Sequence, residues 1–293
     1  MRLSTLNTLL THPLASKHKC KTLTRFFKWG FVNKFGCKSF DYEFIGNTKI
    51  RVKKSFSTAE LQYYCGLSEF NDMGFLLHFL QKGDLFVDIG ANIGSYTLLA
   101  SGHIGTKTIA FEPVPSTFEY LNENIQLNKI ESLTDLRNLG LSDSKGVLKF
   151  TAGLDAINHV VYPENQTKNI IEVPVDTLDN SLIGKNPIML KIDVEGFETM
   201  VIKGASETLK NQNLKAIIIE LNGLANEFGF DELKIHERLI TEGFTPYFYN
   251  PFSRELKSMK GIGTHNTVYL RDIETIKKRI LEAPMVSVFG SKF

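Results

Sequence analysis

The sequence predicts an α/β protein built on a mainly parallel sheet. From Gly83 to about residue 221, short apolar runs alternate with segments of helical periodicity, which is the pattern of consecutive β-α-β units. Residues 188–190 and 216–219 are apolar throughout, as expected for parallel strands that are buried on both faces. Residues 244–249 and 267–270 indicate a final antiparallel pair near the end of the chain.

The elements of this core can be assigned in order. The expected strands cover residues 85–88, 108–111, 133–141, 188–192 and 215–221. The expected helices cover residues 96–101, 117–128, 198–210 and 231–242. Residues 146–151 and 170–175 predict an antiparallel insert between the third and fourth strands.

Residues 1–70 are expected to form an N-terminal extension. No acidic residue precedes Asp41, and lysines and aromatic residues are interspersed in the preceding arm. We expect a helix there whose aromatic side chains pack on the main domain, with contact to a membrane surface or an anionic glycolipid as the alternative. Residues 41–57 predict a hairpin around Gly46 and Asn47, and a helix is expected over residues 69–82. The main domain should then cover residues 71–283, and residues 284–293 should be a tail.

Composition sets only broad limits. The formal net charge of +2 is too small to indicate a nucleic-acid partner by itself. Cys20, Cys37 and Cys65 show neither a C-x-x-C motif nor zinc-like spacing, which suits a reducing compartment. No run has the length of a membrane span and no secretory signal is evident. A cytoplasmic location is expected, with the basic arm as a candidate contact to the inner membrane face.

The strongest chemical signal follows the first expected strand. That strand ends at Asp88, and a loop with Gly90, Asn92 and Gly94 leads into a helix. Glycines there permit a tight turn and close approach of the backbone to a ligand. A dinucleotide enzyme would have G-x-G-x-x-G at this position, to admit a pyrophosphate, whereas this chain has D-x-G-x-x-x-G. The acid suits a positively charged ligand such as S-adenosylmethionine, which carries an ammonium and a sulfonium group.

The second expected strand ends with another acid. Glu112, followed by Pro113, lies about twenty residues beyond the glycine loop, where a carboxylate accepts hydrogen bonds from both ribose hydroxyls of an adenosine. Asp143, after the third strand, is an expected contact for the adenine amino group, although Asp143-Ser144 is also typical of a simple turn.

Five segments together resemble the FkbM family of methyltransferases. They are residues 86–94, 111–113, 141–143, 175–179 and 191–198. The last, K-I-D-V-E-G-F-E, is the most specific, and the resemblance covers about residues 75–221. It implies a class I, Rossmann-like methyltransferase fold with a mainly parallel seven-stranded sheet and a C-terminal antiparallel strand. It also implies S-adenosylmethionine as cofactor and methylation of hydroxyl groups, often on sugars of glycans or glycolipids or on polyketide-type metabolites.

Acidic residues gather where the fourth strand meets its helix. Ligands of open α/β sheets bind beyond the carboxyl ends of strands, so Asp193 and Glu195 should face the cofactor cleft. Methyl transfer to an alcohol requires alignment of the hydroxyl and removal of its proton, for which either carboxylate is the expected base. His159, in the insert, is the second candidate because imidazole titrates near neutral pH. Glu198 lies in the first helical turn, where an acid also complements the helix dipole.

A divalent metal is the less favoured alternative at this place. Asp193 ends the fourth strand, while Glu220 and Asn222 end the fifth, and hard oxygen ligands suit magnesium. Catechol-type methyltransferases place three such ligands at similar strand ends. The simpler explanation is that Glu220 and Asn222 shape the substrate pocket, so no metal site is predicted.

These observations predict an S-adenosylmethionine-dependent O-methyltransferase whose preferred acceptor is a sugar hydroxyl of a glycan or glycolipid. A polyketide or other small-molecule hydroxyl is the alternative acceptor, and a non-catalytic adenosyl-binding scaffold is the alternative to an enzyme. A nucleic-acid acceptor is disfavoured because the chain lacks an Asn-Pro-Pro-Tyr motif at the fourth strand. Oligomeric state stays open.

Overall fold

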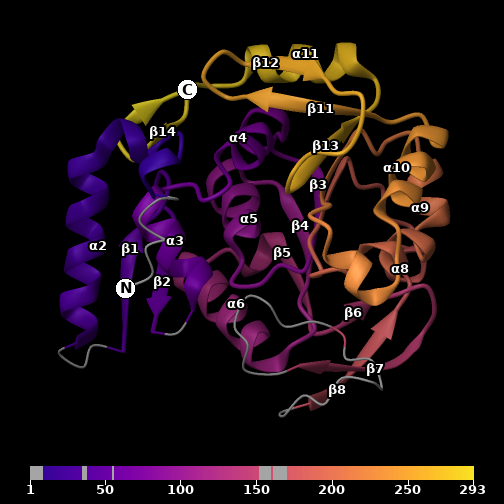
Figure 1. Cartoon of the computed structure of the whole chain (residues 1–293), viewed down its shortest axis with the longest axis horizontal. Helices are drawn as coiled ribbons and strands as arrows, with labels where there is room; N and C mark the ends of the chain where they lie inside the picture. Colours follow the sequence, from indigo (N-terminus) through magenta and orange to yellow (C-terminus); the bar gives the residue numbers. More distant parts are fainter. Residues whose placement is uncertain (1–8, 35–37, 55, 152–159, 161–169) are drawn as a thin grey trace.

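An eight-stranded sheet forms the centre of the molecule (Figure 1), and the computed structural model describes residues 9–34, 38–54, 56–151, 160 and 170–293. The strands run in the order β12-β11-β13-β10-β9-β3-β4-β5. Their bounds are β3 (Leu85–Ile89), β4 (Lys107–Phe111), β5 (Thr134–Arg137), β9 (Met189–Ile192), β10 (Ala216–Glu220), β11 (Thr245–Asn250), β12 (Glu255–Ser258) and β13 (Asn266–Leu270).

The pairing confirms the class I methyltransferase fold. Strands β5, β4, β3, β9 and β10 pair in parallel, so their carboxyl ends meet at one edge. Strand β13 enters between β10 and β11 and is antiparallel to both, as expected for the final pair. The sheet has eight strands where seven were expected, because β12 folds back antiparallel on β11.

Two hydrophobic clusters cover the two faces of the sheet. Along the strands, Phe86 and Met189 point into one cluster, and their neighbours Val87 and Leu190 point into the other. The first cluster contains residues of α4 (Phe70–Phe79), α5 (Ser95–Thr97), the π-helical η2 (Leu98–Ile104), α6 (Pro115–Asn128) and α11 (Ile273–Glu282). The second contains residues of α7 (Leu178–Ser181), α8 (Glu198–Lys203), α9 (Ser206–Lys210) and α10 (Glu232–Thr241). Short 3₁₀ turns are η1 (Ala15–His18), η3 (Glu131–Leu133) and η5 (Leu224–Phe228).

The N-terminal extension packs on the first cluster. It contains α2 (Lys19–Lys34), a hairpin of β1 (Ser39–Glu43) and β2 (Lys49–Lys53), and the unexpected helix α3 (Ser57–Cys65). The hairpin is confirmed. Trp29 of α2 is 2% exposed and joins the core, as expected for the arm, whereas Phe27 and Phe31 remain exposed. Phe35 lies outside the described residues.

The insert forms a separate three-stranded sheet. It consists of β6 (Gly140–Leu141), β8 (Ile170–Asp176) and β7 (Gly146–Thr151), with β7 antiparallel to β8 as predicted. The single strand expected over residues 133–141 is wrong, because the chain leaves the main sheet after β5 and pairs again, with β8, as β6. At this departure the Asn138 amide donates to the carbonyl oxygens of Glu112 and Pro113.

Two further expectations are corrected by packing. The helix expected over residues 198–210 is split at Gly204, where a Cβ would lie 2.1 Å from the carbonyl oxygen of Ser142. The expected tail at residues 284–293 is a hairpin of β14 (Ser287–Val288) and β15 (Ser291–Lys292), and Phe293 is buried against Phe70 at 5.1 Å between ring centroids. Among the described residues, no helix combines the length and apolarity needed to cross a membrane.

Candidate active site

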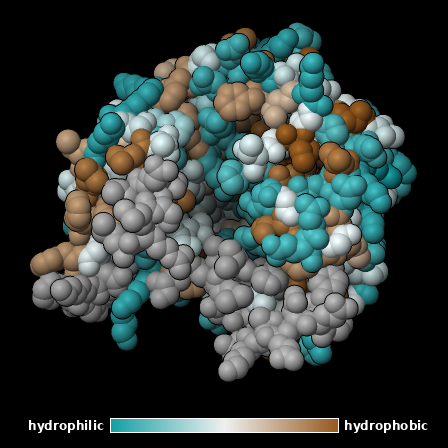
Figure 2. Space-filling view, in the orientation of Figure 1, coloured by the Kyte–Doolittle hydropathy of each residue, from teal (hydrophilic) through white to brown (hydrophobic). Residues whose placement is uncertain are grey.

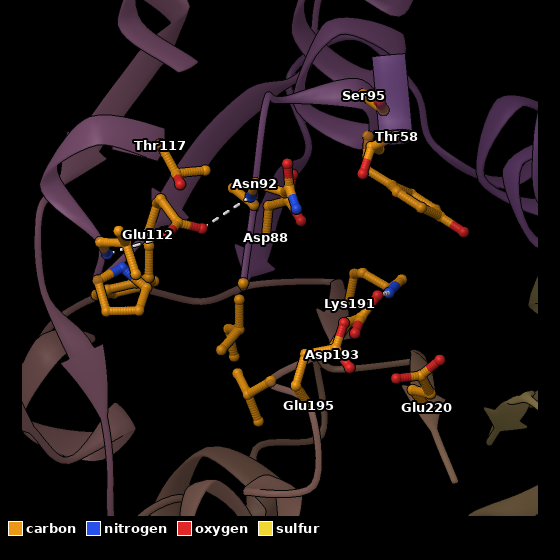
Figure 3. A pocket seen from close by; sticks show the side chains of 18 of the residues that line it. Thr58, Asp88, Asn92, Ser95, Glu112, Thr117, Lys191, Asp193, Glu195 and Glu220 are labelled. Carbon is orange, nitrogen blue, oxygen red and sulfur yellow. Dashed lines mark hydrogen bonds and ion pairs between the residues drawn. The ribbon is translucent and has the colours of Figure 1, made fainter. Parts of the chain in front are cut away.

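A cavity lies at the carboxyl ends of β3, β4, β9 and β10, where Asp88, Glu112, Asp193 and Glu220 line it. Figure 3 shows these side chains directed at a common space, and Figure 2 shows a hollow near the centre of this face. Helix α3 of the N-terminal extension also contributes to the lining, through Thr58 and Gln62. The cavity is therefore lined both by the parallel sheet and by the N-terminal extension.

The glycine loop is held between the neighbouring strands. The backbone N–H groups of Gly90 and Ala91 donate to the carbonyl oxygen of Phe111 at 3.0 and 2.9 Å. Gly90 has φ +77°, and a Cβ there would lie 1.8 Å from the carbonyl oxygen of Asp193. Only glycine fits both the left-handed backbone and this close approach. Gly94, at φ +90°, is similarly close to Leu121, where a Cβ would lie 2.6 Å from Cδ1.

Asp88, the penultimate residue of β3, is a buried carboxylate. Its Oδ2 accepts a hydrogen bond of 2.7 Å from the Thr97 hydroxyl. Burial raises the pKa of Asp88 to about 6, although the Thr97 hydrogen bond and the charge of Lys191 act in the opposite direction. A buried carboxylate of this kind is stabilised by a cation, so this part of the cavity favours a positively charged ligand.

Glu112 is oriented by two backbone donors. Its carboxylate accepts 3.0 Å hydrogen bonds from the N–H groups of Asn92 and Val114 (Figure 3). Each carboxylate oxygen keeps a lone pair after these bonds, so Glu112 retains acceptor capacity for two ligand hydroxyls. Burial raises its pKa to about 7, against the effect of the two N–H groups.

Two polar atoms beside this loop lack partners. The side-chain oxygens of Asn92 and Ser95 are buried without a hydrogen bond among the described residues. Ser95 is 6% exposed, and both residues line the cavity. Because buried polar groups are normally paired, these atoms point to a ligand as their partner. Ser95 was not predicted, since a serine at a helix start is ordinary in sequence.

Lys191 is the basic residue of the cavity lining. Its ammonium lies 2.8 Å from Oδ2 of Asp193 and 5.1 Å from the centre of the Tyr96 ring, and its side chain is 3% exposed. Burial by itself lowers the pKa of Lys191, but the carboxylates of Asp193 and Glu69 outweigh burial and raise it. Lys191 therefore stays charged and holds Asp193 in place.

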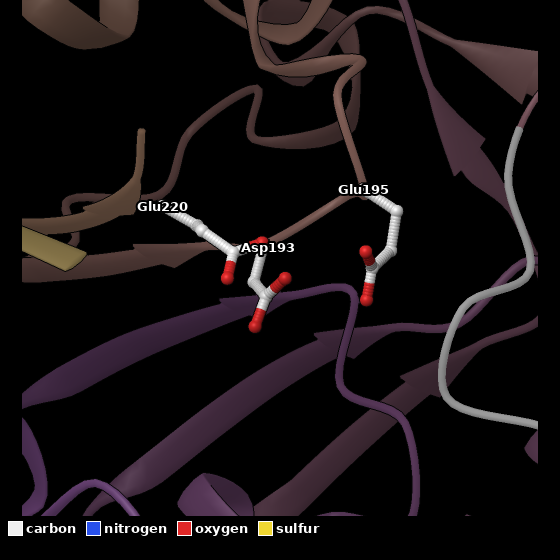
Figure 4. A group of neighbouring side chains, drawn as sticks. All are labelled: Asp193, Glu195 and Glu220. Carbon is white, nitrogen blue, oxygen red and sulfur yellow. The ribbon is translucent and has the colours of Figure 1, made fainter. Parts of the chain in front are cut away.

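Three carboxylates converge beyond Lys191. One oxygen from each of Asp193, Glu195 and Glu220 lies within 4.8 Å of the others (Figure 4). Burial, and then the charge of Asp193, raises the pKa of Glu195 to about 8 and that of Glu220 to about 9. Glu195 also has φ 54°, a conformation that costs a non-glycine residue roughly 1–2 kcal/mol. The group can hold a proton near neutral pH, bind a cation or face a sulfonium.

Residues 88–246 of the chain match the family model described as the methyltransferase FkbM domain. The chain belongs to the FkbM methyltransferase family. It is therefore an S-adenosylmethionine-dependent methyltransferase, as the glycine loop and Glu112 predicted.

Relatives of known name agree with this family. The chain is similar to the hexuronic acid methyltransferase AglP of Haloferax volcanii, at 32% identity over 169 residues, which is 57% of this chain and 68% of that protein. It is also similar to the 31-O-demethyl-FK506 methyltransferase FkbM of Streptomyces tacrolimicus, at 37% identity over 90 residues, 30% of this chain and 34% of that one. Among solved structures, precorrin-6y C5,15-methyltransferase of Geobacter metallireducens aligns with a TM-score of 0.39 and 15% identity, over 70% of this chain and 88% of that one.

The acidic residues of the most specific family segment, residues 191–198, have two roles: some line the cavity and one supports the loop. Asp193 and Glu195 line the cavity, as expected from their place at the end of β9. Glu198 is 1% exposed, and its carboxylate accepts hydrogen bonds from the N–H groups of Val194 and Gly196 at 3.0 and 3.3 Å. Glu198 thus holds the loop that presents Asp193 and Glu195, and the structure favours this local role over a direct one.

A second acidic pair lies beside Lys191 and was not predicted. Glu69 accepts a 2.5 Å hydrogen bond from the Tyr96 hydroxyl, and the Asn266 amide donates to Glu69 at 3.0 Å and to Asp72 at 3.1 Å. Burial, and then the charge of Glu69, raises the pKa of Asp72 to about 7. Glu69 directly precedes α4, Asp72 lies in α4 and Asn266 lies in β13, and all three are far from β9 in the sequence, so no local motif links them.

Of the predicted site residues that the structure describes, eight line one cavity and three do not. The residues that line it are Asp88, Gly90, Asn92, Glu112, Pro113, Asp193, Glu195 and Glu220. Asp143 is exposed and accepts hydrogen bonds from Ser142 and Ser144 in a turn, so the structure does not bring it to the cavity. Asn222 is exposed and accepts the N–H of Leu224, and Glu195 takes its place in the carboxylate group. Gly94 belongs to the glycine loop but packs against Leu121 instead of lining the cavity. His159 lies outside the described residues.

Proposed function

We propose that this enzyme transfers the methyl group of S-adenosylmethionine to a hydroxyl oxygen of a sugar. The observation that carries the proposal is the position of Asp193 and Glu195, two carboxylates that line the same cavity as Glu112 and lie on the side of it toward Glu220 (Figure 3). A cofactor whose ribose lies at Glu112 would direct its sulfonium toward these carboxylates. The acceptor hydroxyl would then approach the methyl group beside a base.

The proposed cofactor contacts follow from the donors and acceptors of the cavity. Glu112 accepts the two ribose hydroxyls with the lone pairs that Asn92 and Val114 leave available. Asp88 lies on the path of the ammonium group, whose positive charge offsets the cost of burying this carboxylate. Oγ of Ser95 gains the partner that the described residues do not give it.

The proposed reaction is a single in-line displacement. The acceptor oxygen attacks the methyl carbon as the carbon–sulfur bond breaks, and the electron pair of that bond stays on sulfur to give S-adenosylhomocysteine. Glu195 takes the hydroxyl proton. Its raised pKa of about 8 makes it a stronger base than an ordinary carboxylate, and the nearby sulfonium favours its charged form when cofactor is bound. Asp193, held by Lys191, aligns the acceptor.

A sugar suits the acceptor end of the cavity because that end is polar. Glu195 and Glu220 lie there, and Thr58 and Glu69, both from residues 1–70, also line the cavity; together they offer hydroxyl and carboxylate groups to a polyol. We therefore propose that residues 1–70 select the acceptor and that residues 71–283 form the methyltransferase unit. The name of the Haloferax relative, a hexuronic acid methyltransferase, supports a sugar acceptor.

A divalent cation is a second candidate for the carboxylate group. The 4.8 Å spacing of Asp193, Glu195 and Glu220 favours it. The 2.8 Å ion pair between Lys191 and Asp193 opposes it, because the ammonium already supplies a positive charge to one of the three carboxylates. We propose the metal-free arrangement.

The test is transfer of labelled methyl groups to a panel of neutral methyl glycosides, hexuronic acid glycosides and hydroxylated lactones, followed by mass spectrometry of the product. We expect a sugar methyl ether. Glu195→Gln should lower kcat by roughly 10²-fold or more and remove the rise of kcat/KM with pH up to about 8, the pKa of Glu195 in the free enzyme. Glu227→Gln, at an exposed position of η5, is the matched control. A methylated lactone without any methylated sugar would refute the sugar acceptor. Full activity of Glu195→Gln would refute Glu195 as the base.

A further inference from the structure

Helix α2 presents apolar side chains on two opposite sides. Trp29 and Thr22, each 2% exposed, face the core. Phe27 is 61% and Phe31 is 65% exposed. Because successive helical residues are about 100° apart, Phe27 and Phe31 lie on one stripe with Cys20 and Thr24, on the side away from Trp29. Cys20, Thr24, Phe27, Lys28 and Phe31, all exposed, are called the outer face of α2 here.

The surroundings of the outer face are basic. Lys28 flanks the two phenylalanines on one side, and Lys19 lies near the start of the helix on the other; both are exposed. Neither α2 nor any earlier residue of the chain is acidic, since the first acid is Asp41. Burying a phenylalanine beside several lysines is unfavourable in a protein core but favourable at a lipid headgroup layer, where the rings enter the acyl boundary and the ammonium groups stay among phosphates.

We propose that the outer face of α2 docks the enzyme on the surface of an anionic lipid bilayer. The aromatic rings would supply apolar burial and the lysines an attraction to the negative headgroups. The helix lies along one edge of the molecule (Figure 1), and Figure 2 shows apolar surface at that edge. The contact is peripheral.

Docking through α2 would place the side of the cavity lined by α3 nearest to the membrane. The Arg25 guanidinium of α2 donates a 2.7 Å hydrogen bond to the carbonyl oxygen of Tyr63 in α3. Helix α3 in turn supplies Thr58 and Gln62 to the cavity lining. One helix thus separates the outer face from the cavity, a geometry that suits an acceptor sugar carried on a lipid. This last step rests on the proposed function, whereas docking itself does not.

A second copy of the chain is a poorer occupant of the same face. In a symmetric contact, the two outer faces would bring Lys28 and Lys19 of both copies together. Like charges at a desolvated contact disfavour association. An anionic surface offers the complementary charge.

The test is co-sedimentation of the full chain with vesicles of phosphatidylcholine alone and of phosphatidylcholine mixed with phosphatidylglycerol. We expect binding to the anionic vesicles only, and weaker binding as salt is raised. Phe27→Ser combined with Phe31→Ser should reduce the partition coefficient roughly tenfold or more. Lys28→Gln should reduce it roughly fivefold. Leu281→Ser, at a 66% exposed position of α11, is the matched apolar control and should bind like the wild type.

Folding and self-association are checked on the same variants. Cofactor titration of the double variant should match the wild type, because neither phenylalanine lines the cavity. The proposal is overturned if anionic vesicles bind no better than neutral ones, or if the double variant binds as well as the wild type. It is also overturned if sedimentation velocity shows a wild-type dimer that the double variant cannot form. None of these results depends on the acceptor, so they are separable from the proposed function.

Discussion

Replacing Gly90 by alanine should test the packing of the glycine loop against β9. Two separate costs arise. At φ +77° a non-glycine residue loses roughly 1–2 kcal/mol. In addition, the new Cβ would lie 1.8 Å from the carbonyl oxygen of Asp193, and because that atom belongs to the backbone, either the loop or the end of β9 must move. Such overpacking costs roughly 1–3 kcal/mol.

Gly83→Ala separates the two costs. Gly83 has φ +94°, and no heavy atom lies within 4 Å of the position that a Cβ would take, so alanine there meets the backbone cost without a clash. We expect a loss of about 1–2 kcal/mol in the free energy of unfolding for Gly83→Ala and about 2–5 kcal/mol for Gly90→Ala. The second value corresponds to a melting temperature lower by roughly 5–15 °C.

The assay combines scanning calorimetry with titration of S-adenosylmethionine. Since the clash displaces the peptide that carries Asp193, Gly90→Ala should also lose at least roughly tenfold in cofactor affinity, about 1.4 kcal/mol. Gly83→Ala should bind cofactor normally. Equal melting temperatures and equal Kd values for the two variants would refute the claim that close approach, in addition to backbone conformation, requires glycine at position 90.

Three further predictions concern charge. Glu112→Gln should weaken S-adenosylmethionine binding by about 2–4 kcal/mol, because the amide cannot accept from both backbone N–H groups and both ribose hydroxyls. Calorimetric titration measures this loss, with Glu119→Gln on the exposed side of α6 as the control. An unchanged Kd would remove Glu112 from the cofactor site. The free enzyme should lose stability as pH rises from about 6.5 to about 9, because burial raises the pKa of Glu195 to about 8 and of Glu220 to about 9, so the folded chain keeps protons that the unfolded chain releases near the ordinary value of 4.5. Thermal melts across that range should show a falling midpoint, less steep in Glu195→Gln, and a flat or rising midpoint would contradict the raised pKa values. Removal of divalent cations with EDTA should leave turnover unchanged; a loss that magnesium restores would show that the carboxylate group containing Asp193 holds a metal.

Local sequence was sufficient to predict those site residues that lie at the ends of predicted strands. Asp88, Glu112 and Asp193 each end an apolar run, and parallel strands bring their carboxyl ends to one edge, so three distant residues were expected in one cleft. The turn with Gly90 was predictable for the same reason, because glycine signals a backbone that other residues cannot adopt. The insert and the final antiparallel pair followed from alternation and turn residues.

Such local patterns could not predict contacts between side chains of elements that are distant in the sequence. Glu69 and Asp72 come close enough to Lys191 for their charges to interact because the start of α4 lies beside β13, where the Asn266 amide donates to both acids. Glu195, and not Asn222, joins Asp193 and Glu220, because the loop after β9 turns at a positive φ that sequence spacing does not reveal. The split at Gly204 and the burial of Phe293 also depend on neighbours that are distant in sequence.

By itself the sequence determined the class of enzyme, its cofactor and the strand ends that form the cleft. The strand ends and the glycine loop follow from local backbone conformation and hydrophobic periodicity, and the class of enzyme follows from the resemblance of short segments to the FkbM family. The tertiary structure decided which carboxylates converge, how far burial raises their pKa values, and that α3 completes the cavity while α2 leaves two phenylalanines exposed. Those properties depend on desolvation and on packing between elements, and both arise only when the chain is folded.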